Sequence, residues 1–301
     1  MTKSNHPQSE SPNMGTQQIH YSRREALMGA AGLAMFATLP DVSSAAAQES
    51  FVPSFEDPVD AMRAHVKLVG SLAKEEVISF YRLNIYADLH DGNFVPMYTM
   101  NNLLIDKWEP KANNIHQMIK YEAGYYTVFD SYEPLSTFTN PATKETLPIQ
   151  SFRLGPVPRG YSPDRFVVMG FHPNPLPLEV IGERVFLATQ SIESAPSFLD
   201  PSVTRYTNSF MTYSAALADM QNDQLPSAPV HAQLQNKTMW QPWMKMGDRP
   251  GGTVVRGFGS KVASLDALPP GVLENFEKLV PQILDTDNWK GFVSEATSGE
   301  E

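Results

Sequence analysis

Two arginines stand among aromatic residues in stretches that alternate like β-strands. Arg82 has the same parity as Phe80, and Arg256 has the same parity as Phe258. Residues two apart in a strand point to one face of the sheet, and an arginine enclosed by aromatic rings is costly unless it is paired. A ligand carboxylate or phenolate would pair it. We therefore expect Arg82 and Arg256 to anchor such a group; the alternative is that both face solvent on the outside of the sheet.

Aromatic and loop residues extend this candidate ligand site, namely Tyr81, Tyr126, His172, Trp240 and Trp243. The two tryptophans lie in a methionine-rich segment, residues 239–246. Tryptophan and methionine suit irregular cavities and flat apolar ligands, and they suit a plug in a barrel equally well. His172 lies in a proline-rich loop, a place where functional residues are common.

The candidate acid and base catalysts are His116, Tyr121 and Glu122, since these groups can exchange protons with a bound substrate. The histidines form neither H-x-H nor H-E-x-x-H, so no metal site is predicted; a site assembled from histidines on distant strands is the alternative. The absence of cysteine excludes thiolate catalysis and cysteine-ligated metals. The serine hydrolase motif G-x-S-x-G is also absent, and no cofactor is predicted.

The first 47 residues have the pattern of a twin-arginine signal peptide. A polar segment leads to Arg23 and Arg24, an apolar run of small residues extends from Ala26 to Leu39, and an alanine-rich site ends at Ala47. The apolar run is shorter than the ~20 residues that span a bilayer. We expect the twin-arginine translocase to export the folded chain to the periplasm, with cleavage near Ala47. An uncut N-terminal anchor is the alternative.

The remaining residues, 48–301, are predicted to form a single β-rich domain. Runs of β-branched and aromatic residues predict strands over 77–86, 94–105, 115–120, 125–129, 135–138, 146–149, 165–171, 183–193, 203–213, 231–243 and 252–262. Residues 151–163 hold three prolines and two glycines, which predicts a loop. Asp57 and Pro58 predict the start of a short helix, and the apolar spacing in 270–284 predicts a second helix.

Hairpin-length connections favour antiparallel pairing, and no strand–helix–strand alternation is present. A long antiparallel sheet tends to curl or close, because closure removes its edges. We therefore predict an antiparallel β-barrel or a strongly curved half-barrel, lipocalin-like in general shape, with the C-terminal helix packed against a mouth or an edge. A two-sheet β-sandwich is the alternative.

Three segments resemble the domain-of-unknown-function 1838 family. They are Met62–Leu72, Phe138–Pro148 and Trp240–Gly247, and the last is followed by Gly259–Val262 and Leu268–Pro269. The resemblance covers nearly all of the chain after the signal segment. It implies no activity and no catalytic residues.

Charge narrows the range of partners. The net charge is −10 and no basic run is present, which argues against nucleic acid as a partner. No second stretch reaches membrane-spanning length. The leading hypothesis is a protein that binds a small apolar or aromatic molecule inside the barrel. The alternatives are a cofactor-independent lyase, isomerase or hydrolase of an aromatic or terpenoid-like compound, and an accessory or interaction protein of the cell envelope.

Overall fold

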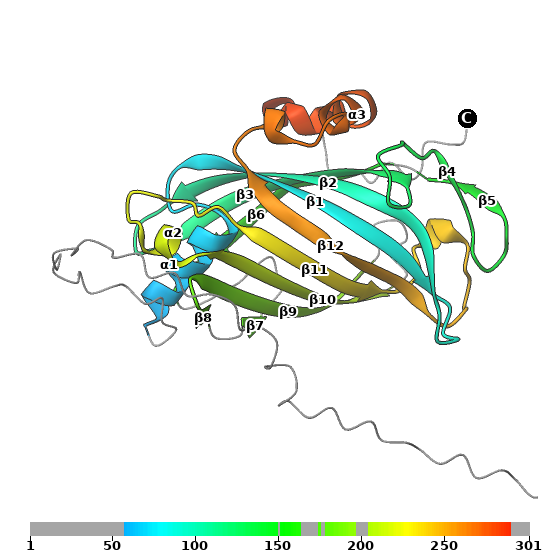
Figure 1. Cartoon of the computed structure of the whole chain (residues 1–301), viewed down its shortest axis with the longest axis horizontal. Helices are drawn as coiled ribbons and strands as arrows, with labels where there is room; N and C mark the ends of the chain where they lie inside the picture. The colour runs from blue at the N-terminus through cyan, green and yellow to red at the C-terminus, as the bar shows by residue number, and fades with distance from the viewer. Residues whose placement is uncertain (1–56, 150, 164–173, 176–177, 197–203, 290–301) are drawn as a thin grey trace, which may run out of the picture. The chain divides into compact units, whose positions relative to one another are not determined.

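Ten strands form one antiparallel sheet in the computed structural model of the chain (Figure 1). The structure describes residues 57–149, 151–163, 174–175, 178–196 and 204–289, all within one compact unit, residues 49–301. The strand order is β6-β3-β2-β1-β12-β11-β10-β9-β7, and β8 pairs with β9. The strands are β1 (Glu75–Asp88), β2 (Phe94–Pro110), β3 (His116–Val128), β6 (Phe152–Tyr161), β7 (Asn174–Pro175), β8 (Glu179–Ile181), β9 (Arg184–Pro196), β10 (Thr204–Ala216), β11 (His231–Thr238) and β12 (Gly252–Val262).

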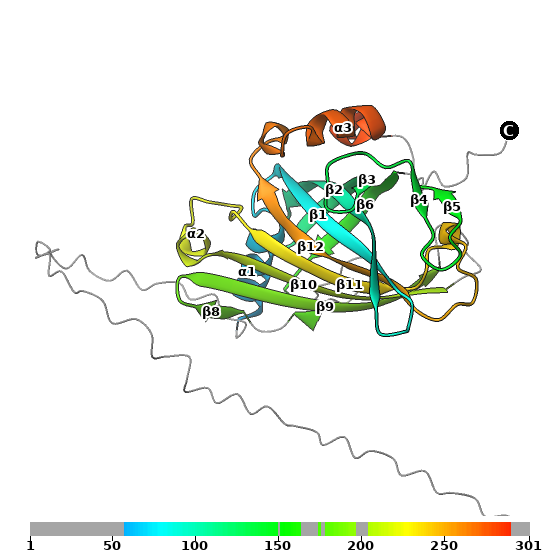
Figure 2. The same ribbon diagram turned by 45° about the vertical axis from the view of Figure 1, so that its right-hand side comes forward.

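The sheet is strongly curved, so its two flanks face each other across a concave side (Figures 1 and 2). The antiparallel, mainly β architecture is thus confirmed. Among the described strands no ladder joins β6 to β9, and the closed barrel is not observed there. The flanks oppose each other as the two sheets of a sandwich would, but they belong to one sheet.

Bulges and glycines allow the strands to bend. The register shifts between Ile85 and Tyr86 in β1 and again between Lys120 and Glu122 in β3, and such bulges increase local twist. In β12 a Cβ added to Gly259 would lie 2.2 Å from the Tyr81 ring. The glycine therefore lets this ring lie flat against the concave face.

Residues 151–163 were predicted to be a loop, and this prediction is wrong for most of the segment. Residues 152–161 form the edge strand β6, which pairs with β3. Proline cannot donate to a ladder, but an edge strand has one side without ladder partners, and prolines are tolerated there and at bulges. Pro156 falls at the register shift between β3 and β6.

Helix α1 (Pro58–Val69) packs against the concave side at one end of the sheet. Asp57 begins it as predicted, with Oδ1 accepting hydrogen bonds from Val59 N (2.7 Å) and Asp60 N (3.3 Å). Met62 and Val66 pack on one flank, with Trp108 and Tyr161. Ala64 and Leu68 pack on the other flank, with Leu187, Ala215 and Met220, the last from the short helix α2 (Leu217–Gln221).

The other end of the concave side is filled by the tryptophan segment and a hairpin. The hairpin consists of β4 (Thr137–Thr139) and β5 (Thr146–Pro148). Phe138, Leu147, Met244 and Met246 are buried there against Tyr98, with Trp240 and Trp243 packed around them. This arrangement matches the plug interpretation of the tryptophan segment.

Helix α3 (Val272–Leu279) lies on the outer, convex face of the sheet and not at a mouth or an edge, which corrects the predicted placement (Figure 1). Val272 and Phe276 pack on Phe80, Leu103 and Tyr125. The predicted helix 270–284 breaks after Leu279 and resumes as a 3₁₀ turn at Pro281–Leu284, so Leu279 is exposed while Ile283 is buried. Within the described residues no helix is long and apolar enough to cross a membrane.

Candidate functional site

A cleft of about 380 Å³ lies on the concave side of the sheet, next to α1. Its walls come from α1, from β1, β2, β3 and β6 on one flank, and from β9, β10 and β11 on the other. Side chains alternate between the two faces of a strand, and this alternation decides which of them line the cleft. Asn102, Leu104 and Asp106 of β2 share the concave face, and their neighbours in register on β3 include Glu122 and Lys120.

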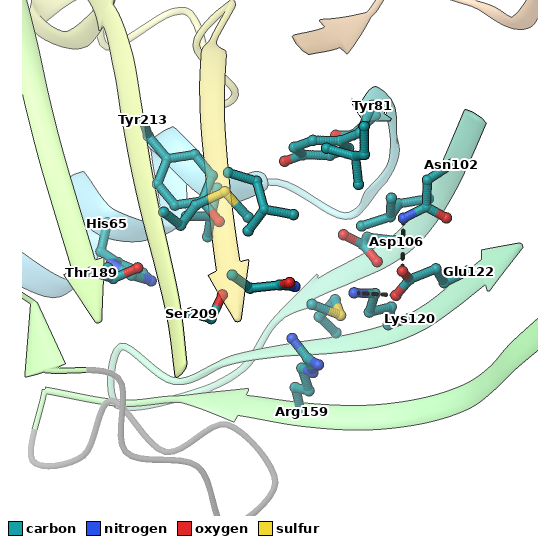
Figure 3. Close-up of a pocket in the computed structure, with 18 of the residues that line it drawn as sticks. His65, Tyr81, Asn102, Asp106, Lys120, Glu122, Arg159, Thr189, Ser209 and Tyr213 are labelled. Carbon is teal, nitrogen blue, oxygen red and sulfur yellow. Dashed lines mark hydrogen bonds and ion pairs between the residues drawn. The ribbon is translucent and has the colours of Figure 1, made fainter. Parts of the chain in front are cut away.

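One ion pair lies on the floor of the cleft (Figure 3). Lys120 Nζ lies 2.6 Å from Glu122 Oε2, and Asn102 Nδ2 donates to Glu122 Oε1 at 2.8 Å. Burial by itself would raise the pKa of Glu122, but the Lys120 charge and these two contacts outweigh burial and hold the pKa below its usual value. Glu122 is therefore a carboxylate at neutral pH.

Asp106 has the opposite character. It is 6% exposed, and burial raises its pKa from 3.8 to about 6, although the charges of Lys120 and Arg159 oppose the rise. Its Oδ1 has no hydrogen-bond partner within the described residues. One cleft thus holds an ionised carboxylate and a carboxyl group that titrates near neutrality, which is the combination that acid–base sites use.

Arg159 reaches into the cleft from β6, opposite Met118 of β3 (Figure 3). It forms no ion pair with any residue that the structure describes, and its buried Nε has no acceptor there. Its charge does act on Asp106, Glu122 and Tyr161, and its guanidinium also donates a hydrogen bond to the Tyr161 phenol. Arg159 is therefore a cation with unused hydrogen-bonding capacity.

Five buried polar atoms without a described partner belong to residues that line this cleft. They are Asn102 Oδ1, Asp106 Oδ1, Trp108 Nε1, Arg159 Nε and Asn236 Oδ1. Buried polar groups in proteins are nearly always hydrogen-bonded, so a group of unsatisfied ones in one place calls for an explanation. Two are donors and three are acceptors.

Aromatic rings form much of the remaining wall. Tyr161 stacks on Trp108 with ring centroids 5.2 Å apart, and Tyr81 and Tyr213 lie higher on the two flanks (Figure 3). Burial raises the pKa of all three phenols, that of Tyr161 to about 12. Burial also lowers the pKa of His65, on α1, to about 4. These four groups keep one protonation state between pH 5 and 8.

A family model described as a protein of unknown function, DUF1838, matches residues 74–299. The chain belongs to the domain-of-unknown-function 1838 family. The match covers every strand of the sheet and all of the lining residues of the cleft except His65 and Val69, which lie in α1. No curated protein and no solved structure matches the chain.

Tyr81 and Glu122 are the two predicted site residues that line the cleft of this DUF1838 protein. Tyr121 does not join Glu122, because consecutive residues of a strand point to opposite faces. It packs on the outer face, against Trp289, with ring centroids 5.3 Å apart. His116 is buried at the start of β3 but does not line the cleft. The predicted trio of His116, Tyr121 and Glu122 is therefore not assembled.

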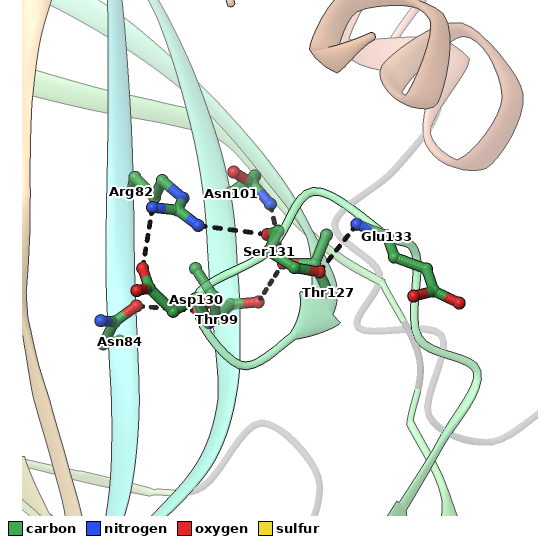
Figure 4. A network of polar contacts seen from close by, with 8 residues as sticks. All are labelled: Arg82, Asn84, Thr99, Asn101, Thr127, Asp130, Ser131 and Glu133. Carbon is green, nitrogen blue, oxygen red and sulfur yellow. Dashed lines mark hydrogen bonds and ion pairs between the residues drawn. The ribbon is translucent and has the colours of Figure 1, made fainter.

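The two predicted arginine anchors face outward, which corrects the expectation that they hold a ligand carboxylate or phenolate inside the sheet. Arg82 shares its face with Phe80, as predicted, but that is the convex face. It pairs with Asp130 at 3.1 Å and donates to Ser131 O at 3.3 Å (Figure 4). Arg256 is exposed. Parity established which residues share a face, and the alternative that this face is the outer one is confirmed.

The other predicted ligand residues lie away from the cleft. Tyr126 packs on Tyr98, and Trp243 packs on Phe138, both in the plug at the far end of the concave side. Trp240 donates from Nε1 to Arg249 O at 3.0 Å in the same region. His172 lies outside the described residues.

Sequence reasoning missed Asn102, Asp106, Lys120, Arg159 and His65. The signal in β2 was weak: Asn102 and Asp106 have the same parity, but they flank an uninterrupted apolar run, Leu103–Ile105. No such signal marked Arg159, because its segment was assigned to a loop. Within the described part of the chain, no group of three or more His, Asp or Glu residues is placed to hold a metal ion.

Proposed function

We propose that the protein binds a small organic molecule in the cleft between Glu122 and Tyr213. The observation that carries this proposal is the convergence of five unpartnered polar atoms on one cleft. A buried polar group without a partner costs about 1–3 kcal/mol, and a molecule with both hydrogen-bond donors and acceptors would relieve that cost by pairing with these atoms. The proposed ligand therefore keeps the predicted character, an apolar or aromatic body with a polar group at one end, but it lies in this cleft and not at Arg82 and Arg256.

The size and the walls of the cleft support the same proposal. Its volume of about 380 Å³ falls within the range of roughly 300–1,000 Å³ found for small-molecule sites. Tyr81, Trp108, Tyr161 and Tyr213 offer aromatic surface to an apolar body. The envelope-accessory alternative called for a shallow apolar patch in place of a cleft, so ligand binding has the stronger support.

Two tryptophan substitutions on neighbouring residues of β10 test this proposal. Ser209 lines the cleft, whereas Phe210 points to the outer face and is 45% exposed. A library of small aromatic acids, amides, phenols and alcohols would be screened against each variant by ligand-observed NMR. We expect Ser209→Trp to abolish binding and Phe210→Trp to preserve it; hits that both variants retain, or no hits on the parent chain, would contradict the proposal.

Acid–base catalysis on the bound molecule is a second candidate function. It is favoured by Asp106, which has an unpartnered oxygen, in the same cleft as the ionised Glu122. These two residues would replace His116 and Tyr121 as acid and base. Each library compound that binds would be incubated with the chain and analysed by mass spectrometry. Turnover that Asp106→Asn removes while binding persists would support catalysis, and unchanged compounds would exclude it for those ligands.

We also propose export through the twin-arginine translocase, with residues 1–47 removed in the periplasm. The proposal is supported by the arginine pair and the short apolar run; residues 1–47 lie outside the described part of the chain. Replacing Arg23 and Arg24 by lysine should leave the precursor in the cytoplasm. N-terminal sequencing of the periplasmic protein would show whether it begins near Gln48.

A further inference from the structure

One of the charged side chains that line the cleft has no ion-pair partner among the described residues. Lys120 and Glu122 neutralise each other across 2.6 Å, and Asn102 uses its amide on the same carboxylate. Arg159 has no ion-pair partner among the described residues. A guanidinium in an enclosed, partly apolar site is favourable only if an anion or several acceptors meet it.

Asp106 does not supply that anion at close range. Its Oδ1 is unpartnered, so no hydrogen bond joins it to Arg159 through that atom. Burial favours its neutral form below about pH 6, in which the carboxyl group donates a hydrogen bond and accepts another. Trp108 Nε1 adds a second neutral donor. Below about pH 6 the residues that line the cleft therefore include a cation and two neutral donors that lack a described partner.

We infer that the cleft takes a small organic monocarboxylate, whose anionic group is held by Arg159 and whose body lies against the tyrosine rings. This ligand class presupposes the binding function proposed above. A monoanion fits better than a phosphate, because a second negative charge would meet Glu122 with no further unpaired cation among the described lining residues. Arginine also matches the planar fork of a carboxylate.

Proton uptake accompanies binding under this arrangement. A bound carboxylate raises the pKa of Asp106 further, since two carboxyl groups in one enclosed site favour sharing a proton. Binding then takes up a fraction of a proton that grows as the pH rises through 6, and affinity should fall roughly fourfold between pH 5 and pH 6.5. A ligand acid with a usual pKa of about 4 is already ionised there, so its own titration does not interfere.

Titratable groups from every element packed around Asp106 act on its carboxyl group. They are Lys120 and Glu122 on β3, Arg159 and Tyr161 on β6, Tyr81 on β1, Tyr213 on β10 and Lys261 on β12. Burial lowers the pKa of Lys261 to about 7. Its Nζ donates to Lys67 O, Gly70 O and Ser227 Oγ. Loss of its charge would also weaken anion binding, so the decisive pH range lies between 5 and 6.5, with Asp106→Asn as the reference.

The test uses four matched pairs of acids and amides: benzoate, 4-hydroxybenzoate, phenylacetate and 1-naphthoate, each with its neutral amide. Dissociation constants would be measured by calorimetry on the parent chain and on Arg159→Met, Asp106→Asn and Arg82→Met. Arg82, on the outer face, is the matched control. We expect at least one acid to bind, its amide to bind more weakly, and Arg159→Met to lose roughly ten- to a hundredfold in affinity while Arg82→Met is unchanged.

Asp106→Asn should still bind the acid but lose the pH dependence between pH 5 and 6.5. Amides that bind as tightly as the acids, an Arg159→Met variant of full affinity, or tighter binding at higher pH would each overturn the carboxylate assignment. So would failure of all four acids to bind at millimolar concentration. In each case the binding function itself is judged separately, by the Ser209→Trp and Phe210→Trp pair on the wider library.

Discussion

Asp106 gives the sharpest prediction about stability, because it is a buried acid whose Oδ1 has no described partner. Its pKa is 3.8 when unperturbed and about 6 in the folded protein. A difference of that size corresponds to about 3 kcal/mol of folding free energy between the protonated and the ionised limits. We predict that Asp106→Asn, which removes the charge but keeps the shape, stabilises the protein at pH 8 by about this amount.

The sign follows from proton binding. The folded state holds the proton of Asp106 more tightly than the unfolded state does, so this residue costs nothing below pH 3.8. The cost grows as the pH rises from 3.8 to about 6 and is then constant. The advantage of Asp106→Asn over the parent chain should therefore be near zero at pH 4 and complete above pH 7.

Urea unfolding of the ligand-free protein at pH 4, 6 and 8 measures this difference. In thermal unfolding, the same 3 kcal/mol corresponds to a rise in Tm of about 6–12 °C for a domain of this size. Asp266→Asn, at an exposed position, is the control and should change stability little at any pH. Equal effects of Asp106→Asn at pH 4 and pH 8 would refute the idea that Asp106 is strained by burial.

Three further substitutions test how the elements hold the cleft in place. Gly259→Ala should lower Tm and displace the Tyr81 ring, because the new Cβ would lie 2.2 Å from it. Adding Tyr81→Ala to this variant should recover part of the lost stability. Strictly additive losses of stability would contradict the clash between Cβ and the ring. Asp57→Ala should cost about 1 kcal/mol in urea unfolding through the lost helix cap, whereas an unchanged midpoint would show that the cap contributes nothing. Phe276→Ala, under α3, should cost roughly 3–5 kcal/mol yet leave binding in the cleft intact, as calorimetry at a temperature where the variant is folded would show.

Local chemistry made several parts of the fold predictable. Asp57 and Pro58 predict the start of α1 because a cap and a first-turn proline act within one helical turn. The strand segments of β1, β2, β9 and β12 follow from alternation and β-branched content, which also depend on near neighbours. Edge strand β6 was missed because its prolines are a local signal for a loop, and only its pairing with β3 makes them tolerable.

Parity along each strand established which residues share a face of the sheet. It placed Arg82 with Phe80, and it also separates Tyr121 from Glu122, which the predicted catalytic trio had joined. It did not determine which face is concave, because that depends on the direction in which the whole sheet curls and on where α1 and α3 pack. Only the tertiary structure brought Asp106, Arg159 and Tyr213 from three strands to one cleft, since contacts between distant segments leave no trace in local spacing.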